Sequence, residues 1–208
     1  MIQMNPSHQN RLIRNFLLYS PVLVCLVIML PRLLSPQFGL MDDGRTVVTA
    51  TQAAHGVWDM SYDAFAGRFR PAYWLYYTLI ELVFGSQAFW FFMGNTLLFA
   101  VTIFSLIKLI KDLGASRLQA WLAGLLFAFT GPTIENYYTL SKAEPLQLAW
   151  LVLSLLLVLR YRSQERFLRR LLIWAGVSLA ILFSALTKET SLIVLPIALT
   201  WLLVGWLR

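Results

Sequence analysis

Two adjacent aspartates, Asp42 and Asp43, follow the first long apolar run of this 208-residue chain. An aspartate can act as a general base that removes a proton from a reacting hydroxyl. The stretch that starts at Gly44 can form a short helix with Asp43 as its N-cap, and the free N–H groups of a helix start stabilise one ionised carboxylate. The second carboxylate can then point at a substrate. Because acids are favoured at helix starts in general, a purely structural role for both stays open.

The same part of the chain holds His55, Asp59 and Asp63, which together with the aspartate pair raise the question of a metal site. No spacing typical of metal ligands is present, and a histidine that precedes a glycine is usually a helix-end residue. We therefore assign no metal ligands and no certain cofactor, and a divalent ion stays an open but unsupported alternative.

Apolar helices must hold these residues, because the chain is 59% hydrophobic and only 13% charged, whereas about half of a soluble domain is apolar. A spanning helix needs about 20 apolar residues, and backbone inside a bilayer must be helical. The sequence therefore predicts an all-α polytopic membrane protein with one transmembrane domain. The six predicted spanning segments are residues 16–34, 86–110, 118–134, 143–160, 171–187 and 190–207. Residues 35–85 form an outer loop that is expected to carry short interfacial helices.

The net charge of +7 indicates topology and not a nucleic-acid partner, because the basic residues fall between the apolar runs and no nucleic-acid-binding motif is present. Basic residues concentrate on the cytoplasmic side of membrane proteins. With a cytoplasmic N-terminus, the cytoplasmic loops hold roughly twice as many basic residues as the outer loops. Nearly all the carboxylates then share the outer surface.

Four stretches, in this order, resemble the GT-C membrane glycosyltransferases, the group that includes protein O-mannosyltransferases and the bacterial lipid A aminoarabinose transferase. They are the "MDDG" pair, "GRFRPAYWLYYTLIELVFG", "FTGPTIENYYTLSKAEPLQLAWLVLSLLLVLRYR" and "SALTKETSLIVLPIAL", and the likeness covers about residues 15 to 205. The resemblance implies an inverting enzyme of the bacterial inner membrane that takes a sugar from a polyprenyl-phosphate donor and is surrounded by membrane lipids. It also implies that these residues are the N-terminal part of such an enzyme.

The resemblance also implies a role for each site residue. Asp42 matches the catalytic base and Asp43 its partner. The leaving group would be a lipid phosphate, so basic side chains are expected to stabilise the charge that develops on it. The implied substrate-binding residues are Arg68, Arg70, Glu135, Lys142, Lys188 and Glu189.

Each binding role has a structural alternative. Arg68 and Arg70 could anchor the chain to lipid headgroups. Lys188 and Glu189 could form a local ion pair, although a charged pair inside apolar sequence is costly unless it faces protein or a water-filled cavity. Glu144 is expected to be a solvated loop residue.

Two other functions stay open. One is a transporter or flippase-like carrier of lipid-linked sugars that performs no chemistry. Transporters often show related halves and broken helices near the midplane. The sequence shows neither, and its polar residues gather at one surface, which favours the enzyme. The other is an inactive, truncated relative.

Overall fold

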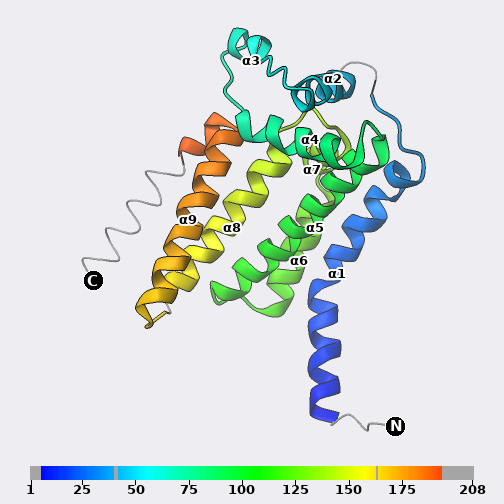
Figure 1. Cartoon of the computed structure of the whole chain (residues 1–208). Helices are drawn as coiled ribbons and strands as arrows, with labels where there is room; N and C mark the ends of the chain where they lie inside the picture. Colours follow the sequence, from blue (N-terminus) through cyan, green and yellow to red (C-terminus); the bar gives the residue numbers. More distant parts are fainter. Residues whose placement is uncertain (1–5, 40–41, 163, 194–208) are drawn as a thin grey trace.

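The computed structural model describes residues 6–39, 42–162 and 164–193, and these residues form helices and no strand (Figure 1). The helices are α1 (Pro6–Leu34), α2 (Asp42–Ala54), α3 (Ser61–Phe65), α4 (Pro71–Phe84), α5 (Ala88–Asp112), α6 (Arg117–Phe129), α7 (Gly131–Tyr138), α8 (Glu144–Arg162), α9 (Phe167–Thr187) and the 3-10 helix η1 (Glu189–Ile193).

Four segments are long and apolar enough to cross a membrane. They are Ile13–Leu34, Ala88–Asp112, Glu144–Tyr161 and Phe167–Thr187. The chain is therefore an all-helical membrane protein with four candidate spanning helices in its described part, and each of the four overlaps a segment predicted from the sequence.

The other two predicted spans differ. The segment 118–134 is two helices, because α6 ends at Phe129 and α7 begins at Gly131 after an extended Thr130. Pro132 explains the break, because in a continuous helix it would have no N–H to donate to the carbonyl oxygen of Ala128 and its ring would clash with that carbonyl, whereas a proline is tolerated in the first turn of α7. Most of the segment 190–207 lies outside the described residues, and its start belongs to η1.

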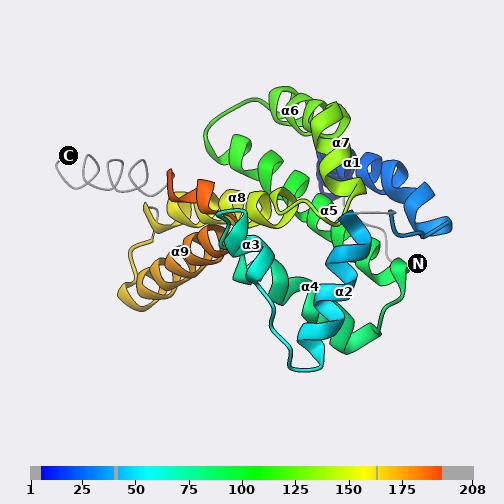
Figure 2. The same cartoon turned by 90° about the horizontal axis from the view of Figure 1, so that it is seen from above.

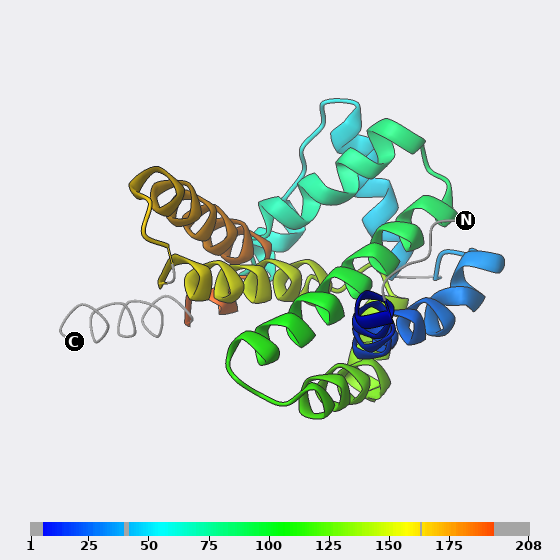
Figure 3. The same ribbon diagram turned by 90° about the horizontal axis from the view of Figure 1, so that it is seen from below.

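The long helices α1, α5, α8 and α9 stand side by side with the shorter α6, and α2, α3, α4 and α7 gather at one end of this bundle (Figures 1 and 2). We call this the α2–α4 end. The α5–α6 and α8–α9 turns lie at the opposite end (Figure 3). Because the chain alternates in direction, the end of α1, the start of α8 and the end of α9 all reach the α2–α4 end.

A buried asparagine joins the α2–α4 end to the bundle. The side-chain amide of Asn95 in α5 donates to the carbonyl oxygens of Tyr137 at 3.2 Å and Thr139 at 3.1 Å. Its amide oxygen accepts a hydrogen bond from the Tyr77 hydroxyl of α4 at 3.0 Å. Buried polar groups need such partners, so Asn95 fixes α4 and the end of α7 relative to α5.

Candidate functional site

A pocket of about 560 Å³ opens at the α2–α4 end of the bundle. Four separate stretches of the chain line it: the start of α2, the residues around the start of α4, the residues between α7 and the start of α8, and the residues directly after α9. The lining residues are Asp42, Arg45, Thr46, Arg68, Arg70, Tyr73, Trp74, Ser141, Lys142, Ala143, Glu144, Lys188 and Glu189. Six of the eight predicted site residues thus meet in one pocket, and Asp43 and Glu135 do not line it.

Asp42 is the first residue of α2 and its side chain is exposed. It lines the pocket, and its carboxylate forms no hydrogen bond or ion pair with the part of the chain that the structure describes. Asp42 therefore offers the pocket an uncommitted proton acceptor.

Asp43, in contrast, is buried and has two backbone partners. Its Oδ2 accepts from the Gly39 N–H at 2.9 Å, and its Oδ1 accepts from the Leu140 N–H at 2.7 Å. It is not the N-cap that the sequence predicted, because α2 already begins at Asp42. Its place is behind the pocket, where it ties the start of α2 to the residues after α7, and it is not positioned to contact a substrate.

Replacing Asp43 with alanine is expected to lower the free energy of unfolding by about 2 kcal/mol. Water can reach Gly39, which is half-buried, but the N–H of the buried Leu140 would lose its partner, and an unsatisfied buried donor carries a cost of this size. Thermal unfolding of the purified protein in detergent measures the change. An unchanged stability would show that the Asp43 bonds do not hold the two segments together.

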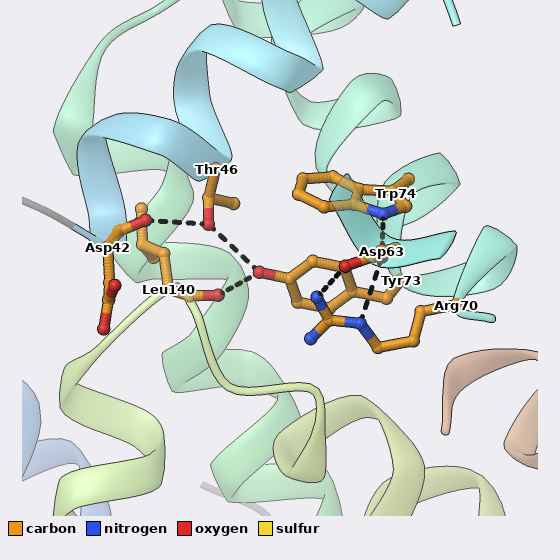
Figure 4. Close-up of polar contacts among 7 residues, drawn as sticks. All are labelled: Asp42, Thr46, Asp63, Arg70, Tyr73, Trp74 and Leu140. Carbon is orange, nitrogen blue, oxygen red and sulfur yellow. Dashed lines mark hydrogen bonds and ion pairs between the residues drawn. The ribbon is translucent and has the colours of Figure 1, made fainter. Parts of the chain in front are cut away.

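Arg70 is held by a buried carboxylate (Figure 4). Its Nε donates to Oδ2 of Asp63 at 3.2 Å and its Nη2 donates to Oδ1 at 2.5 Å. The indole N–H of Trp74 also donates to Oδ2 of Asp63, at 2.6 Å. Burial alone would lower the pKa of Arg70, but the hydrogen bonds and charge of Asp63 exceed that effect and raise its pKa. Arg70 is thus permanently charged and already paired.

Tyr73 connects three walls of the pocket (Figure 4). Its hydroxyl donates to the Leu140 carbonyl oxygen at 2.8 Å and lies 3.0 Å from the Thr46 hydroxyl of α2. The Arg70 guanidinium carbon lies 4.9 Å from the Tyr73 ring centroid. Burial raises the pKa of Tyr73, so the phenol stays neutral and keeps donating to Leu140. Tyr73 therefore has a structural role in forming the pocket.

Each of the two lysines of the pocket forms an ion pair with a glutamate from another part of the chain. Lys142 lies 3.2 Å from Glu135, whose side chain is 64% exposed and stands outside the lining. Lys188 pairs with Glu144 at the start of α8. The expectation that Glu144 is merely solvated was wrong, because the start of α8 and the end of α9 lie side by side. Lys188 forms that pair and not a local one with Glu189.

Arg68 is the predicted cation that is left without a carboxylate. It is exposed, lines the pocket and forms no ion pair with the described residues. Glu189 is likewise exposed at the rim of the pocket. The surroundings of Arg68 are therefore compatible with a role in binding. Arg70 could contact a ligand only while it also keeps its ion pair with Asp63.

A metal site finds no support in the geometry. Within residues 6–39, 42–162 and 164–193, no three His, Cys, Asp or Glu side chains come together in a way that could hold an ion. Asp63, one of the acids considered from the sequence, is committed to Arg70 and Trp74.

Sequence reasoning missed Arg45, Thr46 and Glu144 as lining residues and Asp63 as the partner of Arg70. Asp63 lies in α3 and Arg70 directly before α4, with a non-helical connection between them, so no spacing within one helix indicated the pair. The available signal for this pair was the position of Arg70 directly before the aromatic residues of α4, since an arginine buried among them needs a carboxylate. Comparisons of the chain with protein-family models, with curated proteins and with solved structures gave no match.

Proposed function

We propose that the chain acts as a glycosyltransferase that moves a sugar from a polyprenyl-phosphate donor to an acceptor hydroxyl in this pocket. One observation carries the proposal: the uncommitted carboxylate of Asp42 shares a pocket with five basic residues, at one end of a helical membrane bundle. A volume of about 560 Å³ lies within the range of small-molecule sites, about 300–1,000 Å³. The donor lipid would reach the pocket from the bilayer beside the bundle.

In the proposed reaction Asp42 accepts the proton of the acceptor hydroxyl, and the acceptor oxygen attacks the anomeric carbon of the sugar. The bond between that carbon and the phosphate oxygen breaks with inversion, and polyprenyl phosphate leaves as an anion. Arg68 stabilises the charge on the leaving phosphate. The lysines serve the same phosphate through the N–H groups that their glutamates leave unused.

The pattern of basic residues supports an orientation for this site. With a cytoplasmic N-terminus, the α2–α4 end faces the outer side of a bacterial inner membrane, where a lipid-linked sugar donor and an envelope acceptor would meet.

The test is turnover of a polyprenyl-phosphate sugar by the protein reconstituted in liposomes, measured as release of polyprenyl phosphate. The proposal expects protein-dependent release that increases when an acceptor hydroxyl is supplied. Movement of the donor between leaflets without any release would contradict it and support a carrier.

Replacing Arg68 with glutamine is expected to lower kcat/KM for the donor by about tenfold to a hundredfold, because the charge-assisted contact of the guanidinium with the donor phosphate is lost. Arg68→Lys should recover part of the activity, since it keeps the charge but not the two-point grip. Lys111→Gln, at the opposite end of the bundle, is the control with the same loss of charge. Equal activity of Arg68→Gln and the control would remove Arg68 from the site.

A further inference from the structure

A second hollow lies at the α8–α9 turn. This turn is at the end of the bundle away from the α2–α4 end (Figure 3). This crevice of about 340 Å³ is lined by Tyr161, Phe167, Arg170, Leu171 and Trp174. Phe167, Leu171 and Trp174 are 80%, 50% and 54% exposed, so the crevice presents apolar surface to its surroundings. The Arg170 guanidinium carbon lies 4.5 Å from the Tyr161 ring centroid, which holds a cation at the rim of an apolar surface.

The charge around this crevice is strongly positive. Residues 160–170 contain five arginines and a single acid, Glu165. Arg166, Arg169 and Arg170 stand exposed at the start of α9, and none of the three forms an ion pair with the described part of the chain.

That position is unfavourable for cations. The start of a helix carries the positive end of its dipole, and the first turn of α9 holds no acidic residue to offset it. Like charges three or four residues apart on a helix, as Arg166 is from Arg169 and Arg170, also destabilise it. An anion bound beside these arginines would relieve both effects.

The geometry points to a binding site for the headgroup of an anionic phospholipid at the α8–α9 turn. Arg170, which lines the crevice, and Arg166, one helical turn before it, bind the lipid phosphate, and Phe167, Leu171 and Trp174 pack along the first carbons of an acyl chain. The apolar lining favours a lipid over a free phosphate ion, because only a lipid has acyl chains that can pack against the exposed aromatic and leucine side chains. Aromatic side chains gather at the membrane–water interface, and clusters of basic residues beside spanning helices attract anionic lipids. The site is independent of the proposed sugar transfer.

The test compares the affinity of the full chain, purified in neutral detergent, for dioleoylphosphatidylglycerol and for dioleoylphosphatidylcholine, with bound lipids counted by native mass spectrometry. The wild type should bind the first phosphatidylglycerol more tightly than phosphatidylcholine. In the double variant Arg166→Gln/Arg170→Gln this affinity should fall about 30-fold, whereas binding of phosphatidylcholine should not change. The matched control Lys108→Gln/Lys111→Gln removes two charges at the same end of the bundle and should behave as the wild type.

A third variant separates the crevice from bulk charge. Trp174→Ala leaves every charge in place and should still weaken phosphatidylglycerol binding severalfold, because it opens the apolar lining. Equal losses in the two double variants would overturn the site, as would equal affinity of the wild type for the two lipids. Displacement of the lipid by an equal concentration of inorganic phosphate would also overturn it, in favour of a free anion site.

Discussion

Replacing Asp42 with asparagine is expected to lower turnover of a polyprenyl-phosphate sugar about a thousandfold, because the proposed reaction loses its general base. Asparagine keeps the size of the side chain but cannot accept the proton of an acceptor hydroxyl. Stability should stay within about 0.5 kcal/mol of the wild type, since the Asp42 carboxylate is exposed and contacts no described partner, so only its interaction with the α2 dipole is lost. Initial rates of polyprenyl phosphate release and thermal unfolding in detergent measure the two effects.

Asp59→Asn is the matched control for this experiment. Asp59 is an exposed aspartate of the same segment between α1 and α4, does not line the pocket, and accepts a hydrogen bond from the Ser61 N–H at 2.9 Å. It should retain full turnover. Retained activity in Asp42→Asn, or an equal loss in both variants, would remove Asp42 from the proposed chemistry.

Replacing Asp63 with asparagine is expected to lower the free energy of unfolding by about 3–5 kcal/mol, because it leaves the Arg70 charge buried without a counter-charge. The loss of the pair also frees the Arg70 side chain from its place beside Tyr73, so the shape of the pocket should suffer with the stability. Chemical or thermal unfolding in detergent measures the change.

A double variant distinguishes the buried charge from general damage. In Asp63→Asn/Arg70→Met both charges are gone, and the asparagine oxygen can still accept from the Trp74 indole. Most of the lost stability should return, since a buried pair contributes little against an apolar replacement. A double variant as unstable as Asp63→Asn alone would show that the ion pair is not the source of the loss.

The gathering of Asp42, Arg68, Arg70, Lys142, Lys188 and Glu189 could be predicted because it follows from topology. Apolar runs alternate in direction, and residues that follow odd-numbered spans share one side whatever the details of packing. The number of helices at the α2–α4 end was harder to predict. Pro132 was a visible signal that the 118–134 segment breaks, but the apolar composition on both sides of it favoured a single helix.

The roles of individual charges could not be predicted from spacing. Asp42 and Asp43 are neighbours in the chain, yet successive residues of a helix point about 100° apart, so one faces the pocket and the other the interior. Which glutamate pairs with Lys188 depends on where the ends of α8 and α9 meet, and that is set by packing of the whole bundle.

The ion pairs of the pocket differ in how far water and salt reach them. Arg70 and Asp63 are almost fully buried, whereas Lys188 and Glu144 are each about 30% exposed and Lys142 and Glu135 more so. Ionic strength screens exposed charges over about 10 Å at 0.1 M and acts much less on buried pairs. Added salt therefore weakens the ion pairs of Lys142 and Lys188 with their glutamates and leaves the Arg70–Asp63 pair intact. The two lysines become more mobile, but the same salt weakens their attraction for an anion in the pocket.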